Sequence, residues 1–363
     1  MKDYIFIFGR DPELSYIELK TYLNTRNKEF KVKIFNEFGI ILGINNIDVS
    51  KVIKDLGGTS KIAEVVDLEK IELYHGKKNK IVYGVSAYLG DDCDIREYLK
   101  ARLKKEKLKA MIKTSKKREP FLTPSESIVV FKDGFEIIVF GKFVGMVKAV
   151  YDPSEYKKRD INKPVQRPLH TISIRLAKIL INLSGAKEGD VVLDPFCGIG
   201  VIMQEALLMK MDAIGIDVEA KCVNDSMKNV NWVKKMYNVD GKFRIIKGDS
   251  RYVQNYVKKV DVVATEPYLG PFMKKLPTPE KARDVVRKLT PMYADLLKGL
   301  NKVVKGKVAI VMPRFRLYDG KRIKINFLKL IDEAGFKPKK DFPIVYVAVK
   351  SKMEREIWVI EKK

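Results

Sequence analysis

The segment VDVVATEPYLGPF runs from a β-branched strand pattern into a loop with proline and glycine, and it carries Glu266 and Tyr268 at that break. A carboxylate there could orient an amine and accept its proton, assisted by a backbone carbonyl beside Pro267, while the ring could stack on a base. Alternatively, Glu266 caps a helix or pairs with Lys274 or Lys275, and Tyr268 packs into the core. We favour the catalytic interpretation because three acids precede it at comparable positions.

These three acids follow three successive strand patterns. Asp194 ends VVLD, Asp217 ends AIGID and Asp249 follows RIIKG. Because the carboxyl ends of parallel strands meet at one edge of a sheet, the three side chains should face one crevice. A carboxylate can accept two hydrogen bonds from a ribose diol, which suits Asp217, or one from an exocyclic amine, which suits Asp249. Gly198 and Gly200 allow the backbone to approach a ligand at the start of the following helix.

The acids also restrict the class of ligand. Carboxylates often cap helices after strands, but capping explains three in series less well. They would repel a phosphate, and the turn lacks the GK[ST] signature of a phosphate-binding loop. A ligand with a ribose, an adenine and a positive centre fits better, and S-adenosylmethionine has all three. Three Cys and two His are too few and too scattered to predict a metal site or a disulfide framework.

A sheet is needed to bring these residues together, and from residue 172 the chain alternates strand and helix patterns. This alternation predicts an α/β fold with a mostly parallel sheet covered by helices. The predicted strands are Val191–Pro195, Ala213–Asp217, Phe243–Gly248, Val260–Thr265 and Lys307–Met312, followed by a hairpin of PIVYVAVK and EIWVIEKK.

The first 150 residues show a mixed pattern of strands and helices. A helix is predicted over Asp94–Glu119, because apolar residues recur there mostly at helical spacing. Residues 127–150 are predicted to form strands that turn at Asp133–Gly134. Residues 151–171 contain three prolines, clustered charges and little periodicity, which predicts a linker.

Charge gives the first indication of a partner. The chain has 71 Lys and Arg against 46 Asp and Glu, a net charge of +25, which favours polyanions. The alternative is a surface that is cationic without a specific partner. The cations of the predicted Asp94–Glu119 helix are candidates for phosphate contacts rather than a merely solvated face: Arg96, Lys100, Lys104, Lys113, Lys116, Lys117 and Arg118. No apolar run approaches the ~20 residues of a membrane span, and the few cysteines fit a reducing, cytoplasmic setting.

The motifs DPFCGIG, GIDV, GDS and TEPYLG, in this order, resemble those of Rossmann-like methyltransferases that modify amino groups of bases. LGGTSKIAEVV, YDPSEYKKRDINKPVQRP and SIRLAKILINLSGAKEGDVVLDPFCGIG resemble the THUMP-containing tRNA guanine-N2 methyltransferases, the archaeal and eukaryotic type acting on guanosine 10 of tRNA. The resemblance implies an N-terminal ferredoxin-like domain (1–65), a THUMP RNA-binding domain (66–150), a linker (151–171) and a Rossmann-like methyltransferase domain (172–363). It also implies S-adenosylmethionine as cofactor and tRNA as partner, and it leaves a small activating protein partner and the oligomeric state open.

The resemblance also implies roles for individual residues. Asp194, Cys197, Gly198 and Gly200 match the motif around the methionine end of the cofactor, Asp217 matches the ribose acid, Asp249 and Ser250 lie near the adenine, and His170, Thr171 and Ser173 match a segment that closes over the methionine. One motif departs from the family, which has Asp-Pro-Pro-Tyr-Gly where this chain has EPYLG. An ungapped alignment puts Leu269 at the tyrosine position, whereas a shift of one residue keeps Tyr268 in the aromatic role.

The expected function is therefore S-adenosylmethionine-dependent methylation of the N2 amine of guanine in tRNA, catalysed by Glu266, Pro267 and Tyr268. One alternative is methylation of another base amino group, such as adenine N6, in structured RNA. Another is a catalytically weak THUMP-type RNA-binding protein, which only the departure at EPYLG favours. Methyl transfer to bulk tRNA separates the enzymes from the binding protein.

Overall fold

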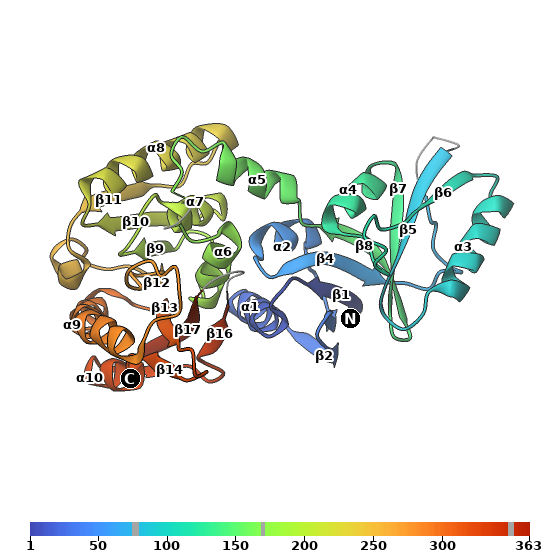
Figure 1. Ribbon diagram of the computed structural model, residues 1–363. Helices are drawn as coiled ribbons and strands as arrows, with labels where there is room; N and C mark the ends of the chain where they lie inside the picture. Colours follow the sequence, from blue (N-terminus) through green and yellow to red (C-terminus); the bar gives the residue numbers. More distant parts are fainter. Residues whose placement is uncertain (75–79, 168–170, 348–351) are drawn as a thin grey trace. The chain divides into compact units, whose positions relative to one another are not determined.

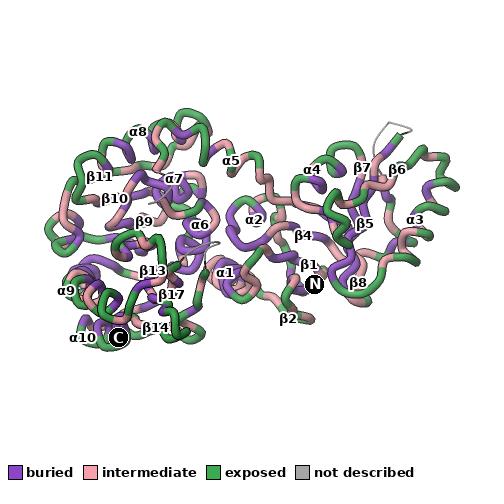
Figure 2. The backbone as a smooth tube through the Cα atoms, viewed as in Figure 1, coloured by how far each residue is buried: buried purple, intermediate pink, exposed green. Residues whose placement is uncertain are grey.

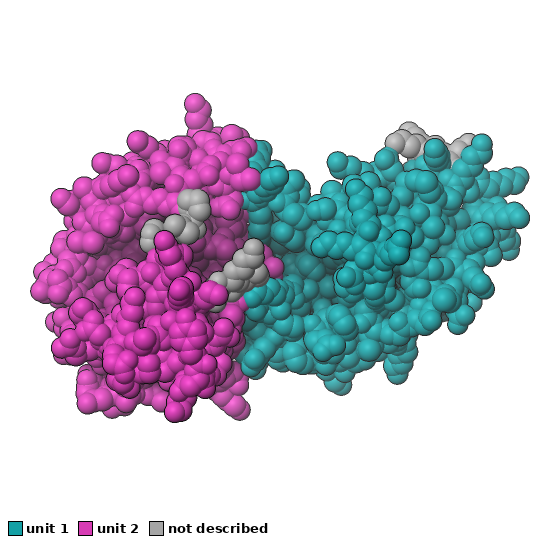
Figure 3. Space-filling model, in the orientation of Figure 1, with its two compact units in different colours: residues 1–158 teal, residues 159–363 magenta. Residues whose placement is uncertain are grey.

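The computed structural model describes residues 1–74, 80–167, 171–347 and 352–363. The chain divides into two compact units, Met1–Lys158 and Arg159–Lys363, which Figure 3 colours separately. Among the described residues, no helix is long and apolar enough to cross a membrane.

The first unit is built on one eight-stranded sheet, with strand order β2-β3-β1-β4-β8-β7-β5-β6. Its elements are β1 (Lys2–Phe8), α1 (Pro12–Thr25), β2 (Phe30–Phe35), β3 (Gly39–Ile44), α2 (Val49–Asp55), β4 (Thr59–Val65), β5 (Lys80–Leu89), α3 (Cys93–Lys105), β6 (Lys109–Lys113), α4 (Pro124–Asp133), β7 (Gly134–Phe140) and β8 (Phe143–Val150). β4 ends where the first predicted domain ends, and it pairs antiparallel with β8, so the sheet continues across that predicted boundary.

The predicted helix over Asp94–Glu119 is wrong in its second half. Helix α3 ends at Lys105, and Lys107 adopts a left-handed conformation with φ 56°. The amide of Leu108 then donates to the carbonyl of Leu103, and this hydrogen bond ends the helix. Lys107 occupies the left-handed position where a glycine is usually found. Residues 109–113 form β6, parallel to β5. The sequence has no glycine or proline at this point to indicate the end of the helix, and apolar residues continue at helical spacing beyond it.

The predicted strands over residues 127–150 are wrong at their start, because residues 124–133 form α4. Thr123 and Glu126 make a capping box, and Pro124 occupies the first turn. This TPSE signature was visible, but the β-branched residues after it favoured a strand. The predicted linker likewise contains a helix, α5 (Pro153–Ile161), and the boundary between the two units falls within it.

The second unit contains the predicted mostly parallel sheet, with strand order β11-β10-β9-β12-β13-β17-β15. Its strands are β9 (Val191–Asp194), β10 (Asp212–Asp217), β11 (Phe243–Lys247), β12 (Val262–Thr265), β13 (Val308–Arg316), β14 (Arg322–Lys324), β15 (Phe336–Pro338), β16 (Ile344–Tyr346) and β17 (Met353–Lys362). The first five are parallel, and β17 is antiparallel to β13 and to β16, which confirms the C-terminal hairpin.

Helices cover this sheet as the alternating pattern predicts. They are α6 (Ile174–Leu183), α7 (Val201–Leu208), α8 (Ala220–Tyr237), the 3-10 helix η1 (Ser250–Asn255), α9 (Pro279–Val303) and α10 (Phe327–Glu333). α7 contacts α6 and α8, and α9 contacts α10, as can be followed in Figure 1. α9 also contacts η1. Every residue of β12 is buried, and Figure 2 shows how burial concentrates in the strands and on the inner sides of the helices.

Candidate active site at the carboxyl edge of the second sheet

Asp194 ends β9 and is buried, with 3% of the residue exposed. Its carboxylate accepts hydrogen bonds from the hydroxyl of Thr265, at 2.7 Å, and from the amide of Phe196, at 3.1 Å. Burial is the main reason that the pKa of Asp194 is raised to about 7, and the negative charges of Asp217 and Glu266 add to this. The carboxyl group therefore changes its charge near neutral pH.

The two glycines of the turn have different roles. Gly198 has φ 51° and open space where a Cβ would stand, and its amide donates to Asp217 Oδ2 at 2.9 Å. Gly200 has φ 82° and is the N-cap residue of α7, and a Cβ there would lie 2.5 Å from the Ser226 hydroxyl on α8. Gly198 therefore has open space beside its backbone, and its role toward a ligand stays a prediction, whereas Gly200 is required by the packing of α7 against α8.

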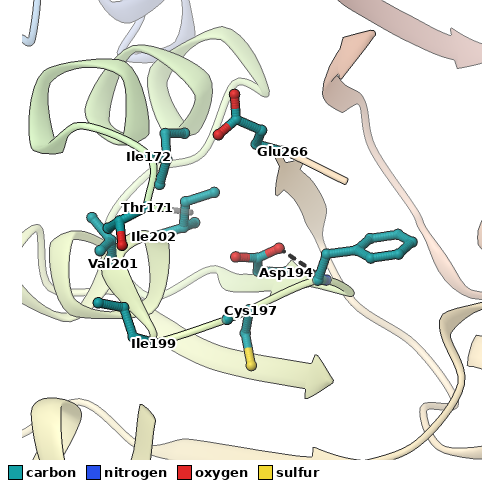
Figure 4. A pocket seen from close by; sticks show the side chains of 10 residues that line it. Thr171, Ile172, Asp194, Cys197, Ile199, Val201, Ile202 and Glu266 are labelled. Carbon is teal, nitrogen blue, oxygen red and sulfur yellow. Dashed lines mark hydrogen bonds between the residues drawn. The ribbon is translucent and has the colours of Figure 1, made fainter. Parts of the chain in front are cut away.

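A pocket lies beside this turn, with about 320 Å³ of space including its open mouth. It is lined by Thr171, Ile172, Asp194, Phe196, Cys197, Gly198, Ile199, Val201, Ile202 and Glu266. Figure 4 shows the carboxylates of Asp194 and Glu266 among apolar side chains, with the thiol of Cys197 pointing away from both. Burial raises the pKa of that thiol far above its usual range, so it remains neutral.

The predicted acid near the adenine has a strong partner of its own. Asp249 caps η1 by accepting from the amide of Arg251, and it forms an ion pair with the Arg251 guanidinium at 2.6 Å. The side-chain hydrogen bonds from Arg251 are the largest cause of the lowered pKa of Asp249. Ser250 is buried and donates to the carbonyl of Pro195. Asp249 and Ser250 do not line the pocket, and their assignment to the adenine stays a prediction.

The predicted closing segment falls only partly within the described residues. Thr171 lines the pocket, and its hydroxyl donates to the carbonyl of Arg167. Ser173 caps α6 by accepting from the amide of Leu176 at 3.2 Å. His170 lies outside the described residues.

Glu266 follows β12 directly, and its side chain is 14% exposed. Its Oε1 lies 2.6 Å from Nε of Arg355 on β17. Arg355 stands 89 residues from Glu266 and takes the place of Lys274 and Lys275, the partners that the sequence suggested. Arg355 stands one residue before the predicted strand EIWVIEKK, so no predicted element included it.

The loop after Glu266 presents one aromatic ring to solvent. Tyr268 is 54% exposed, whereas Leu269 is 8% exposed and Pro267 is buried. The hydroxyl of Tyr293 donates to the carbonyl of Tyr268 at 3.1 Å, which fixes the backbone of the loop. Leu269 is therefore held in the protein, and Tyr268 is the residue of this motif whose ring is accessible to a base.

The predicted phosphate-contacting cations belong to three elements rather than one helix. Arg96, Lys100 and Lys104 lie on α3, Lys113 lies on β6, and Lys116, Lys117 and Arg118 follow β6. Arg96 is half-buried, forms an ion pair with Asp92 at 2.6 Å and donates to the carbonyl of Val85. Lys113 is half-buried and the other five are exposed.

Comparison with known proteins places this site among methyltransferases. A family model described as "RMKL-like, methyltransferase domain" matches residues 164–316. The tRNA (guanine(10)-N2)-dimethyltransferase of Methanothermobacter thermautotrophicus is 36% identical over 111 residues, which are 30% of this chain and 31% of that protein. The protein of the same name from Pyrococcus abyssi is 23% identical over 384 residues, covering 99% of both chains. The matches to the first three relatives span less than two thirds of their lengths.

The fold has counterparts among solved structures. TrmN from Thermus thermophilus aligns with a TM-score of 0.54 at 16% identity, over 99% of this chain and 100% of its own. A possible methylase from Clostridium difficile 630 aligns with a TM-score of 0.50 at 12% identity, over 100% and 99%. A second family model, described as "DNA methylase", matches residues 5–228, more than half of the chain. The curated relatives confirm the resemblance to tRNA guanine-N2 methyltransferases, and by the family model that matches more than half of its length the chain belongs to the DNA methylase family.

Proposed function

We propose that the protein transfers a methyl group from S-adenosylmethionine to the exocyclic N2 amine of guanine in tRNA, at guanosine 10. The observation that carries this proposal is the position of Glu266, which follows β12 and lines the same pocket as Asp194 and Gly198. The names of the M. thermautotrophicus and P. abyssi relatives support the choice of base and of RNA.

The pocket suits this cofactor. Asp194 and Glu266 supply negative charge next to apolar walls, which favours a cationic sulfonium and disfavours phosphate. Gly198 leaves its Cβ space empty, so a ligand can approach the backbone. Asp217 does not line the pocket, but it accepts from the amides of Gly198, which does, and of Glu219, and its remaining lone pairs can accept from ribose hydroxyls. When bound, the cofactor supplies an electrophilic methyl group on a positively charged sulfur.

Glu266 then acts on the amine. Its carboxylate accepts one N–H and the carbonyl of Pro267 accepts the other, so that the nitrogen lone pair is directed at the methyl carbon. The bound cofactor would supply the methyl group, and its sulfur would keep the electron pair of the broken C–S bond. The nitrogen becomes cationic, the carboxylate stabilises that charge, and it accepts the proton that the nitrogen loses.

Tyr268 and the basic surface of the first unit bring the base to this site. The exposed ring of Tyr268 stacks on a guanine that has left its helix. Exposed cations on α3 and after β6 contact tRNA phosphates, which gives affinity without sequence information. The ferredoxin-like and THUMP assignments of residues 1–65 and 66–150 belong to this proposal.

The test is methylation of tRNA with a radiolabelled methyl group, followed by mass spectrometry of the nucleosides. We expect N2-methylated guanosine from the wild-type protein. The description "DNA methylase" favours a second candidate, transfer to adenine N6, which the same measurement recognises as N6-methyladenosine. If the protein binds tRNA but transfers no methyl group to any nucleic acid offered, the enzymatic proposal is wrong and an RNA-binding protein remains.

A further inference from the structure

The ion pair between Arg355 and Glu266 crosses the sheet. In strand order, β13 lies between β12 and β17, and Arg355 is the register partner of Pro313 on β13 and of Tyr346 on β16. Its Nε lies 2.6 Å from Glu266 Oε1, and the two side chains are only 20% and 14% exposed. A charge-assisted hydrogen bond of this length is stronger than one between neutral groups.

The neighbours of Arg355 on β17 make different contacts. Glu354 pairs with Arg314 and Arg322, and Glu356 pairs with Lys324. Because side chains alternate along a strand, Glu354 and Glu356 share one face of β17 and Arg355 points to the other. Arg355 therefore reaches Glu266 of the pocket, whereas Glu354 and Glu356 point away from it.

Among the described residues, the contacts of the Glu266 carboxylate involve one oxygen. Oε1 accepts from Arg355, and no hydrogen bond is found for Oε2. A glutamate has one more rotatable bond than the aspartate of the related motif, so its carboxylate has more positions to choose from. The contact with Arg355 selects among them.

We propose that Arg355 is a positioning residue for methyl transfer: it holds Glu266 by Oε1 and leaves Oε2 to accept an N–H of the substrate amine. This inference rests on the proposed function, and it explains how the longer acid of EPYLG can replace the shorter one. Arg355 acts through Glu266 and does not touch the substrate. Arg355 takes no part in the bonds that are made and broken in the transfer.

The experiment measures single-turnover methylation of tRNA and the binding of cofactor and tRNA separately. Arg355→Met should lower kcat by roughly 10- to 100-fold, the scale of a misplaced catalytic group, with the Kd of each ligand changed by less than about 3-fold. Arg355→Lys retains the charge without the guanidinium geometry and should recover part of the rate. Arg322→Met is the matched control, since it removes an arginine that pairs with β17 through Glu354, and its kcat should equal that of the wild type.

A double-mutant cycle identifies the route of the effect. If Arg355 acts through Glu266, Arg355→Met should add little to Glu266→Gln. Equal losses in both backgrounds, or a wild-type kcat in Arg355→Met beside an inactive Glu266→Gln, would overturn the inference and leave the proposed function standing. A wild-type protein that transfers no methyl group would overturn both. Thermal melting checks that each variant folds, and if Arg355→Met does not, the cycle is run with Arg355→Lys.

Discussion

Asp194 and Glu266 line the same pocket, yet the protein compensates their burial differently. Asp194 has neutral donors, a hydroxyl and an amide, and its pKa is raised to about 7. Glu266 has a guanidinium at 2.6 Å. A carboxylate removed from water is stabilised either by gaining a proton or by pairing with a cation. The first applies to Asp194 at the end of β9, and the second applies to Glu266 after β12. The first acid can respond to the charge of a ligand, and the second keeps a fixed orientation.

The largest expected effect comes from removing the charge of the paired acid. Glu266→Gln keeps the shape and one acceptor, so binding of cofactor and tRNA should persist while the methylation rate falls by ~100-fold or more. Glu266→Asp shortens the side chain and loses contact with Arg355, so its rate should fall even though it restores the residue of the related motif. Single-turnover assays measure both. A wild-type rate in Glu266→Gln would mean that backbone acceptors and positioning suffice.

The acid that supports the turn should affect binding rather than chemistry. Asp217→Ala removes acceptors for ribose hydroxyls and the contact to the Gly198 amide, and it should weaken cofactor binding by about 1.5–3 kcal/mol. Calorimetry with S-adenosylmethionine measures this loss. An unchanged affinity would remove the ribose assignment of Asp217.

The hydrogen-bond donors to Asp194 are neutral, so we expect ligand binding to depend on the protonation of this carboxyl group and hence on pH. With a pKa of about 7, the carboxyl is mostly neutral at pH 6 and mostly ionised at pH 8. If a cationic ligand binds the ionised form, its affinity should rise by roughly tenfold between these values, because the competent fraction rises by that factor. Calorimetry at pH 6 and pH 8 measures the change, and Asp194→Asn should abolish it. A wild-type protein whose affinity is flat over this range would show that Asp194 does not sense the ligand's charge.

The sequence predicted the positions of these acids but not their partners. Strand ends are visible in a single sequence, because apolar runs stop at Asp194, Asp217 and Glu266, and the βαβ alternation implies that parallel strands share an edge. The contact with Arg355 depends on β17 entering the sheet antiparallel beside β13. No local pattern encodes that register, so the partner of Glu266 could not be predicted.

Two predictions in the first unit were wrong for a related reason. Each depended on a contact that the hydrophobic pattern does not encode, here between residues close together in the sequence. Met111 and Ile112 continue the helical spacing of α3, but Lys107 adopts a left-handed conformation where the helix ends. A lysine in the sequence does not indicate such a conformation. In α4, a capping box outweighed the strand preference of Ile128 and Val129. The predicted cationic helix therefore became three separate elements, and its cations are not equivalent.

We expect the smallest effect from replacing single cations of the first unit. As with Asp194 and Glu266, the comparison is between a charge that has an ion-pair partner and charges that are exposed to solvent. Lys116, Lys117 and Arg118 are exposed, whereas Arg96 is half-buried and paired with Asp92. Each phosphate contact releases counterions, so replacing Lys117 by Ala should weaken tRNA binding modestly and lower the slope of log K against log salt by about 1. Arg96→Ala should leave that slope unchanged, because its charge is already neutralised within the protein. Binding of the full chain to tRNA at several salt concentrations measures both variants. Equal slopes for the wild type and all single variants after β6 would place the RNA contacts elsewhere, and a reduced slope in Arg96→Ala would show that the ion pair with Asp92 opens when RNA binds.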